Sequence, residues 1–587
     1  MNNSAQYLQA GPFHYFPGYL KQRRQPCMMV TMQPTAKLKE ATQTPKVLAF
    51  FKWWMTELYA DSNTTATPDE LQHWPALAQH IAEATRALLT YLGFPLLDAS
   101  SIEPPPRGAQ APWTKVPLPI PHCEPSLVVD AWQLTVASLN HALQTGKHDT
   151  HRLQQQLEKL KEASRFSVSP LLLNAAYQLD LPVTPLHGML TQFGQGVKAS
   201  WLEHTSTEHT PSLAVRTARD KQAAAIRLRQ AGLPTAPHHE VTNQQDALQA
   251  AQALGYPVVV KPLNLDGGVG VAANLQNPQE VTAAYAIAHK HSPRVLLEKH
   301  VIGHDFRLTV LDNAMVWAVQ RVPAGVTGDG TQTIEQLIAE ENQTDQRRPG
   351  IQQTLQPLTV NSEATQLLQS QGHKLTAVPA KGQFITLRRT ANVANGGRPV
   401  VVTAQVHPDN VTLATRAAQA LRLDLAGVDL IIPDISRSWR EPNNRGVICE
   451  VNAQPDLGST TAGHLYPLLL QKRVQGNGRI PVVVIAGDAS STVFDDVCRE
   501  LRTEGAEHIG WCRPSQAGIN EETLSTARSL FANAMMLLTT PTVDALVLNI
   551  TDDEPLKRGL PCDRIDRVIL SEHHQNLHPL VRDMLKV

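Results

Sequence analysis

LAGVDLII (residues 425–432) and VICEVNAQP (residues 447–455) are two apolar segments of strand length in this chain of 587 residues. Side chains alternate between the two faces of a strand, so Glu450 and Asn452 point to one face and Val451 to the other. The polar stretch between the segments, PDISRSWREPNNRG (433–446), is suited to a hairpin loop. Folded in this way, Asp429 lies beside Glu450 and Asn452.

The polar side chains of this strand pair predict a magnesium site. Oxygen-bearing side chains are costly to bury in apolar strands unless something compensates them. Mg²⁺ takes hard oxygen ligands and completes its shell with waters and phosphates. Asp429 alone would fit a polar position at a strand edge equally well, but Asp429, Glu450 and Asn452 together favour the metal.

The chain around these segments alternates between strands and helices from about Leu171 onward. Asp220 is suited to cap a helix that begins at Lys221, and Gly232 and Pro234 are suited to end it. The pattern predicts helices over 221–231, 246–254 and 278–289 and strands over 256–261, 295–298, 306–311 and 315–322. This order indicates an α/β or α+β domain.

A glycine-rich loop, NLDGGVG (264–270), follows the strand that ends at Lys261. Gly267, Gly268 and Gly270 allow backbone N–H groups to approach a phosphate, and the lysine adds a positive charge for the same oxygens. The loop is not a Walker A motif, because no Gly-Lys-Ser/Thr follows it. Alone it is weak evidence for a nucleotide site.

Two carboxylates, Glu298 and Asp305, flank the predicted loop between two strands. One could meet an adenine amine and the other a ribose hydroxyl, although each alone would also fit a surface carboxylate. Guanidinium groups in or beside apolar strands suit phosphate or carboxylate ligands. The arginines in such places are Arg307, Arg321, Arg388 and Arg389.

The two ends of the chain have different patterns. Residues 1 to about 160 are irregular, with helical periodicity over 46–59, 75–92, 129–143 and 150–162 and a proline-rich connector over 103–125. From Arg479 the sequence predicts a strand over 480–486, a helix over 493–503 and a buried parallel strand over 544–550. That order is typical of the start of a nucleotide-binding α/β domain.

Composition argues against several classes of protein. The chain has 52 Lys and Arg residues against 53 Asp and Glu, a net charge of −1, which is unlike a bulk basic surface for nucleic acid. The six cysteines form no C-x-x-C pair and predict free thiols in a reducing cytoplasm. No secretory signal is recognisable, and no apolar run approaches the roughly 20 residues of a membrane helix. The length predicts three or four domains at roughly 150 residues each.

In order and spacing, the residues above resemble the ATP-grasp ligase family from about Ala218 to Pro455 and, more narrowly, the cyanophycin synthetases. The segments that carry the resemblance are YPVVVKPLNLDGGVGV, LLEKHVIGHDFRLTVLD, PAKGQFITLRRTANVANGG, and LAGVDLIIPDI followed by CEVNAQPD. The resemblance implies a multidomain chain of α/β and α+β class. Its expected parts are an N-terminal α+β domain (1–165), a central ATP-grasp domain with its preceding linker (166–475) and a truncated α/β domain related to Mur ligases (476–587).

The resemblance also implies a reaction and roles for residues. ATP would phosphorylate a peptide carboxylate, and an amine would attack the acyl phosphate to form an amide, with Mg²⁺ as the metal. The implied ATP contacts are Lys221, Lys261, Gly267, Gly268, Glu298, the Val301 backbone and Asp305. The implied metal ligands are Asp429, Glu450 and Asn452. The implied catalytic cations are Arg307, Arg321 and Arg389.

The C-terminal segment departs from this family. Cyanophycin synthetases have a second ligase domain with a Walker-type loop ending in Gly-Lys-Thr, whereas this chain has RIPVVVIAGDASSTVFDDV (479–497). The lysine is absent, and Asp488 would repel phosphates. We therefore expect this domain to lack ATP chemistry and to be structural, with contacts in a homodimer as one role.

Cyanophycin synthetases with two active sites add aspartate and arginine in turn, and a chain with one ATP site cannot do both. The resemblance therefore implies ATP-dependent polymerisation of ready-made β-Asp-Arg, or a close relative such as β-Asp-Lys, as in the second class of this family. The expected partners are the β-aspartyl dipeptide and the growing polymer, with no nucleic acid and no membrane. Two alternatives stay open: another ATP-grasp amide ligase that makes a small product, and a non-catalytic polymer-binding subunit.

Overall fold

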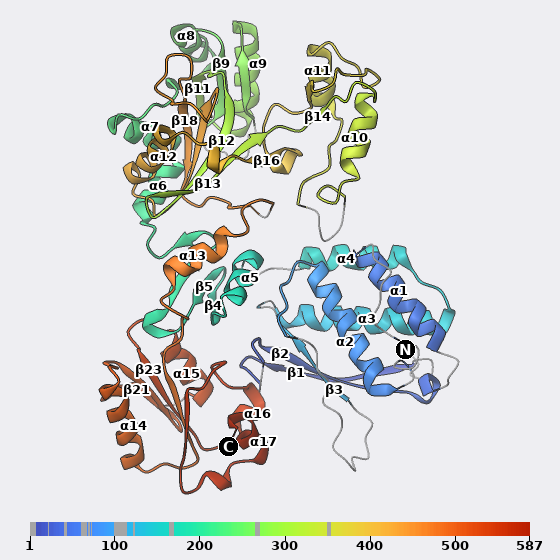
Figure 1. Cartoon of the computed structure of the whole chain (residues 1–587), viewed down its shortest axis with the longest axis vertical. Coiled ribbons are helices and arrows are strands. Elements are labelled where there is room, and N and C mark those ends of the chain that lie inside the picture. The colour runs from blue at the N-terminus through green and yellow to red at the C-terminus, as the bar shows by residue number, and fades with distance from the viewer. Residues whose placement is uncertain are drawn as a thin grey trace. The chain divides into compact units, whose positions relative to one another are not determined.

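A computed structural model describes residues 7–20, 23–39, 44–59, 67, 71, 73–98, 114–120, 122, 124–163, 169–263, 270–348, 354–458, 460–526 and 528–586. The chain forms two compact units (Figure 1): unit 1 contains residues 1–204 and 467–587, and unit 2 contains residues 205–466. Both units mix helices with sheets, which confirms the predicted mixed α/β multidomain class. The three-domain division at 165/166 and 475/476 stays a prediction.

The first sheet of unit 2 has four antiparallel strands in the order β10-β9-β11-β8. Its strands are β8 (His238–Val241), β9 (Val258–Pro262), β10 (Ala272–Leu275) and β11 (Val295–Lys299). Two helices pack on one face, α8 (Gln244–Leu254) and α9 (Pro278–His291), where Val258, Val260 and Leu297 are buried. The alternation within β9 turns Lys261 to the opposite face.

The second sheet of unit 2 has five antiparallel strands in the order β16-β13-β12-β17-β18. They are β12 (His304–Leu311), β13 (Ala314–Val322), β16 (Arg398–Val401), β17 (Leu425–Ile432) and β18 (Val447–Asn452). The helices α6 (Ser212–Arg219), α7 (Lys221–Gln230) and α12 (Pro408–Ala420) cover one face, with Leu308, Val428 and Val451 in the shared core. The other face carries the polar side chains. The predicted hairpin of 425–432 and 447–455 is confirmed.

The helix predicted after Asp220 is confirmed as α7. The Asp220 carboxylate accepts hydrogen bonds from the backbone N–H groups of Gln222 and Ala223, both at 3.0 Å. This cap fixes Lys221 at the first position of the helix. A smaller lobe of unit 2 follows β13, and it consists of β14 (Gly325–Thr327), β15 (Phe384–Thr386), α10 (Ile334–Asn342) and α11 (Ser362–Ser370). The short β7 (Ser206–Thr207) lies at the start of unit 2.

The N-terminal part of unit 1 is a three-stranded antiparallel sheet, β1-β2-β3, with a helical layer. Its elements are β1 (Leu8–Phe16), β2 (Cys27–Pro34), α1 (Thr44–Tyr59), α2 (Trp74–Tyr91), β3 (Thr114–Pro119), α3 (Pro125–Thr145) and α4 (Thr150–Ala163). The four predicted helices are confirmed. The proline-rich connector predicted over 103–125 is wrong in part, because it contains the strand β3.

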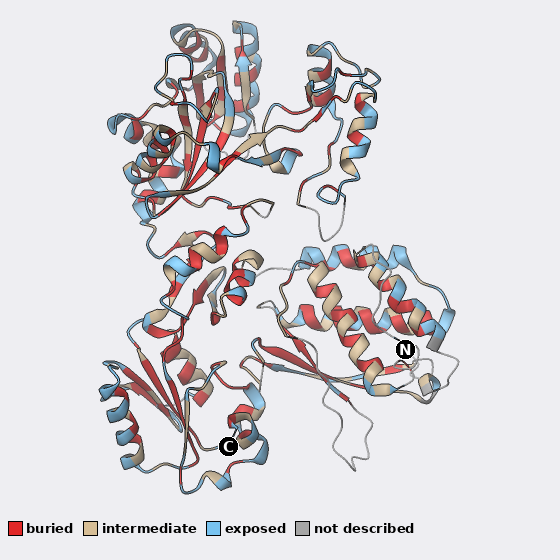
Figure 2. Ribbon diagram, in the orientation of Figure 1, coloured by how far each residue is buried: buried red, intermediate tan, exposed pale blue. Residues whose placement is uncertain are grey.

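The C-terminal part of unit 1 is a six-stranded sheet in the order β22-β21-β20-β23-β19-β24. The strands β19 (Val482–Ala486), β20 (Ile509–Arg513), β23 (Ala545–Ile550) and β24 (Arg567–Leu570) are parallel, as the sequence predicts for 480–486 and 544–550. Figure 2 shows β19 and β23 buried along their whole length. The remaining elements are β21 (Gln516–Ile519), β22 (Glu522–Ser525), α13 (Leu465–Arg473), α14 (Ser491–Thr503), α15 (Leu530–Leu538), α16 (Glu554–Arg558) and α17 (Pro579–Leu585).

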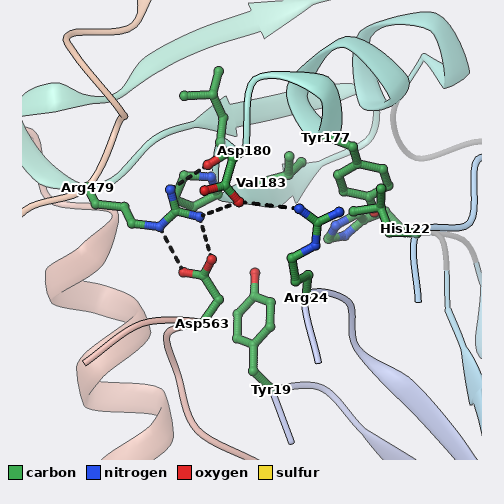
Figure 3. Close-up of a pocket in the computed structure, with 11 residues that line it drawn as sticks. Tyr19, Arg24, His122, Tyr177, Asp180, Val183, Arg479 and Asp563 are labelled. Atoms are coloured by element: carbon green, nitrogen blue, oxygen red, sulfur yellow. Dashed lines mark hydrogen bonds and ion pairs between the residues drawn. The ribbon is translucent and has the colours of Figure 1, made fainter. Parts of the chain in front are cut away.

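A short linker region of unit 1 contains α5 (Pro170–Gln178), β4 (Val183–His187), β5 (Leu190–Phe193) and β6 (Ser200–Glu203). A charge cluster around the buried Arg479 and Asp563 joins it to the rest of the unit (Figure 3). Arg479 donates to the Asp563 carboxylate, with 2.5 Å between Nη2 and Oδ2, and also to the backbone carbonyl of Asp180. Arg24 approaches the Asp180 carboxylate at 3.5 Å, and the hydroxyl end of Tyr19 points to the same place.

Two sequence expectations concern cysteines and membranes. The cysteines that the structure describes, Cys27, Cys449, Cys498, Cys512 and Cys562, are free thiols, as predicted, while Cys123 lies outside the described residues. Within the described ranges, no helix has the length and apolar character needed to span a membrane.

Candidate active site

The polar face of the five-stranded sheet brings together the predicted metal ligands and two of the predicted cations. Strand pairing places Arg307 opposite Asp429, and Asp429 opposite Glu450. Asn452 lies two residues beyond Glu450 on the same face and opposite Gly427. The hairpin predicted from the sequence therefore places Asp429 beside Glu450 and Asn452, as observed.

Asp429 is a buried carboxylate held by two arginines. Arg307 donates to both of its oxygens, through Nε to Oδ1 and through Nη2 to Oδ2 at 3.1 Å. Arg321 Nη2 lies 3.0 Å from Asp429 Oδ2 and 2.7 Å from Asp305 Oδ1. Two carboxylates and two guanidinium groups thus form one connected cluster on β12, β13 and β17.

Burial and charge act in opposite directions on these groups. Burial alone raises the pKa of Asp429, but the charges of Arg307 and Arg321 outweigh it and hold the pKa below its ordinary value. For Asp305, burial and repulsion by Asp429 outweigh the attraction of Arg321 and raise the pKa. Burial lowers the pKa of Arg321, yet the two aspartates reverse this and raise it, so the guanidinium stays charged. The two arginines are thus held in fixed positions by the two aspartates.

The two predicted lysines each face a carboxylate. Lys261 Nζ lies 2.8 Å from Glu298 Oε1, and both side chains are largely buried, at 14% and 15% exposure. Burial lowers the pKa of Lys261, but the attraction of Glu298 more than offsets it and the pKa is raised. Lys221 Nζ lies 3.9 Å from Glu450 Oε1. Each of the two lysines therefore faces a carboxylate of the expected nucleotide site.

The predicted crossover between strands joins the two sheets of unit 2. Glu298 lies on β11 in the four-stranded sheet, and Asp305 lies on β12 in the five-stranded sheet. Val301 is in the short connection between these strands, next to the exposed Ile302. Gly267 and Gly268 lie outside the described residues.

Arg389 lies apart from the cluster in the strand order. It follows β15 in the smaller lobe, its side chain is exposed, and its backbone N–H donates to Glu363 at 3.0 Å. The neighbouring Arg388 is buried and donates to Thr359 and Asn361, which is a structural role. The role of Arg389 stays a prediction.

The donor set of the expected metal site fits Mg²⁺ in chemistry. It consists of two carboxylates and one amide, and the described residues contain no cluster of three or more His, Cys, Asp or Glu suited to a metal. Among the described residues, Asn452 Nδ2 is buried without a hydrogen-bond partner. A carboxylate has about four lone-pair sites, so Asp429 can hold its arginines and still accept another ligand. Asp429, Glu450 and Asn452 are therefore able to offer hard oxygens on one face.

Two features of the site escaped sequence reasoning. The pairing shifts between Asp429–Glu450 and Leu430–Ile448, which leaves Cys449 as the extra residue of a β-bulge. Its thiol lies near Glu298 and Lys261, and burial raises its pKa. Gly427 is the second feature, because a Cβ there would lie 2.8 Å from Arg307 Nη1 and 2.9 Å from Pro455 Cβ. No local pattern reveals either feature, since both depend on the neighbouring strand.

The loop after β19 is tightly packed at Gly487. Gly487 adopts a positive φ of 91°, and a Cβ on it would lie 2.5 Å from Ser571 Oγ and 2.7 Å from His574 Cα. The segment after β24 therefore packs directly against the backbone of Gly487. Besides lacking the Walker lysine, the loop has no room for a side chain at Gly487.

Comparison with known proteins gives three findings. Residues 228–329 match the family model described as D-ala D-ala ligase C-terminus. The cyanophycin synthetase of Trichormus variabilis is 32% identical over 433 residues, which cover 71% of this chain and 48% of that protein. The cyanophycin synthetase of Synechocystis sp. is 30% identical over 442 residues, 72% of this chain and 50% of that protein. The chain thus spans about half the length of these curated relatives.

Among solved structures, a bifunctional glutathione synthetase from Pasteurella multocida covers 76% of this chain and 81% of its own. Its TM-score is 0.40 and its sequence identity is 16%.

Proposed function

The chain is a homologue of the cyanophycin synthetases over 71–72% of its length, and we propose that it is an ATP-dependent ligase that polymerises β-aspartyl dipeptides. The proposed substrate is β-Asp-Arg or a close relative such as β-Asp-Lys. ATP phosphorylates the carboxylate at the end of the growing chain, and the amine of the next dipeptide attacks the acyl phosphate. An amide forms and phosphate leaves.

The observation that carries this proposal is the row Arg307–Asp429–Glu450 on the open face of the sheet, with Arg321 and Lys221 beside it. A reaction between two anions, ATP and a carboxylate, needs cations fixed in position rather than a protein nucleophile. Arg307 and Arg321 are fixed by Asp429 and by the sheet. In the proposal they neutralise the transferring phosphoryl group and the substrate carboxylate.

The other predicted site residues have proposed roles in binding ATP and Mg²⁺. Lys221 and Lys261 bind phosphate oxygens, Glu298 and the Val301 backbone hold adenine, and Asp305 holds ribose. The proposed ligands of Mg²⁺ are Asp429, Glu450 and Asn452. Bound there, the ion would neutralise phosphate charge. Gly267 and Gly268 are proposed as backbone contacts for phosphate, and Arg389 as a further cation.

The sequence and packing of the loop at Gly487 support a ready-made dipeptide as the substrate. The loop has no lysine, Asp488 would repel a phosphate, and Ser571 and His574 pack against Gly487, so we expect no ATP site in that loop. The central sheet then supplies one activating site, which performs one kind of coupling. In the proposal the C-terminal sheet has a structural role, and a homodimer and a cytoplasmic location remain proposals.

The test is to give the purified protein ATP and Mg²⁺ with either β-Asp-Arg or free aspartate plus arginine. Phosphate release and turbidity are followed together. We expect both signals with the dipeptide and neither with the free amino acids. Response to the free amino acids would reject the one-site interpretation, and phosphate release with only a soluble small product would favour a different amide ligase.

Substitutions of proposed site residues test whether the activity depends on this site. Lys261→Ala and Glu450→Gln should abolish ADP release, since each removes a charge from the proposed nucleotide and metal contacts. Glu441→Gln is the matched control, because Glu441 lies in the hairpin loop and pairs with Arg437 at the surface. Unchanged turnover in Lys261→Ala would reject the site, and absence of turnover in every protein would favour a polymer-binding subunit.

A further inference from the structure

A second row of residues lies beside the proposed catalytic row, on the same face of the five-stranded sheet. Strand pairing places Trp317 opposite Thr309, Thr309 opposite Gly427, and Gly427 opposite Asn452. The proposed catalytic row is Val319–Arg307–Asp429–Glu450. On each strand, the residue of the new row lies two positions from the residue of the catalytic row, so the two rows are roughly 7 Å apart along the strands. We call the new row the second row.

The second row contains hydrogen-bond donors without partners. In the part of the chain that the structure describes, Trp317 Nε1 and Asn452 Nδ2 are both buried and unpaired. A buried donor without an acceptor costs roughly 1–3 kcal/mol, so two of them in one row need an explanation. Between them, Arg307 Nη1 lies over Gly427, where a Cβ would come within 2.8 Å of it. The row itself has no carboxylate side chain, so it is suited to a ligand that brings oxygen acceptors.

The segment after β18 covers the second row. Pro455 lies against Gly427, with 2.9 Å between Pro455 Cβ and the position of an added Cβ. The ring of the exposed His464 meets the ring of Trp317 edge to face, with centroids 4.6 Å apart. His464, whose side chain is exposed, therefore covers the Trp317 end of the second row.

A β-aspartyl dipeptide has one carboxylate that takes no part in any step of the polymerisation. The α-carboxyl and the α-amine of the aspartyl residue react, while the α-carboxylate of the second residue stays free. That group is a strong double acceptor, and a hydrogen bond to a charged acceptor is roughly twice as strong as one between neutral groups. It is present whether the second residue is arginine or lysine.

We propose that Trp317 binds this unreacting carboxylate of the incoming dipeptide through its indole N–H, and that His464 positions the Trp317 ring. Trp317 is thus a specificity-determining residue that selects peptides with a free carboxylate. The inference rests on the proposed function for its substrate, but the binding step is testable without turnover.

The experiment compares wild type, Trp317→Phe and His464→Ala, with β-Asp-Arg and with the same dipeptide carrying an amide in place of the α-carboxylate of its second residue. Calorimetry measures binding of each peptide, and steady-state kinetics measures KM for peptide and for ATP. Trp511→Phe is the matched control, because it removes an indole N–H that donates to Asn520 in the C-terminal sheet.

The expected result is a rise of roughly 10-fold in Kd and KM for β-Asp-Arg in Trp317→Phe, with KM for ATP unchanged. Wild type should bind the amide roughly 10-fold more weakly than the acid, and Trp317→Phe should bind both alike. His464→Ala, which changes an exposed side chain, should weaken dipeptide binding less and keep the preference for the acid.

Equal dipeptide binding in wild type and Trp317→Phe would overturn the inference, as would an equal rise in KM for ATP. A wild-type protein that binds the dipeptide through Trp317 without coupling it would overturn the proposed function alone. Failure of wild type to bind the dipeptide would overturn the inference together with its substrate.

Discussion

The central five-stranded sheet and the C-terminal six-stranded sheet use their faces differently. In the central sheet, one face of β12, β13, β17 and β18 packs on helices and the other carries Arg307, Arg321, Asp429 and Glu450. In the C-terminal sheet, β19 and β23 are buried on both faces and almost wholly apolar, and Ser571 and His574 pack against Gly487 in the loop after β19. Strand order alone therefore does not make a nucleotide site. An open face with charged side chains is needed as well.

The largest expected effect comes from Asp429→Asn, which removes the charge that holds Arg307 and Arg321. We expect ADP release to fall by at least about 100-fold, because the cations lose their fixed positions. Assays of ADP release at saturating ATP measure it. Asp488→Asn makes the same chemical change in the C-terminal loop and should leave ADP release unchanged. Equal losses in both variants would contradict the contrast between the two sheets.

Arg479→Met tests the structural role of the C-terminal sheet. Removing this buried guanidinium leaves the Asp563 carboxylate, itself largely buried, without its partner. Breaking a buried ion pair costs about 3–5 kcal/mol of folding free energy. Thermal unfolding should show a lower midpoint, while ADP release well below that midpoint should persist. Loss of nucleotide turnover in a folded Arg479→Met protein would assign the C-terminal sheet a part in the reaction.

Gly427→Ala tests whether the position of Arg307 on the polar face of the central sheet matters for activity. The new methyl group would meet Arg307 Nη1 and Pro455, and such overpacking costs about 1–3 kcal/mol. We expect ADP release to fall roughly 10-fold to 100-fold with the fold retained, as seen by circular dichroism. Gly463→Ala is the control, because nothing lies within 4 Å of an added Cβ there. Wild-type turnover in Gly427→Ala would show that Arg307 has room to move without loss.

The smallest expected effect concerns pH and the stability of unit 1. Burial lowers the pKa of His122 to about 4 from an ordinary value of 6.5. The unfolded chain therefore takes up this proton first as the pH falls. The stability that the neutral ring contributes is present above pH 6.5 and is lost between 6.5 and 4.

His122→Gln should remove that dependence. The difference in unfolding free energy between wild type and the variant should shrink by about 1–3 kcal/mol from pH 7 to pH 4. Urea unfolding at several pH values measures it. A difference that stays constant over this range would mean that the imidazole is not kept neutral in the folded protein.

The central sheet was predictable because apolar and charged residues alternate in its strands. Asp429, Glu450 and the cap at Asp220 lie where strand and helix periodicity place them. The N-terminal sheet was not predictable in this way, because β1 contains Gly11-Pro12 and β3 contains Pro117 and Pro119. Both are edge strands, where a missing N–H is tolerated, and β1 shifts register around its glycine and proline. Neighbouring strands, rather than local sequence, determine such positions.

The pairing of β17 with β18 restricts how this chain can change in evolution. Inserting or deleting one residue within either strand would exchange its two faces and turn Asp429 or Glu450 into the apolar core around Val428. The loop from 433 to 446 lies outside the paired segments, so its length can vary without exchanging the faces. Lineages of this protein should therefore differ in the length of that loop, while the strands themselves change by substitution alone.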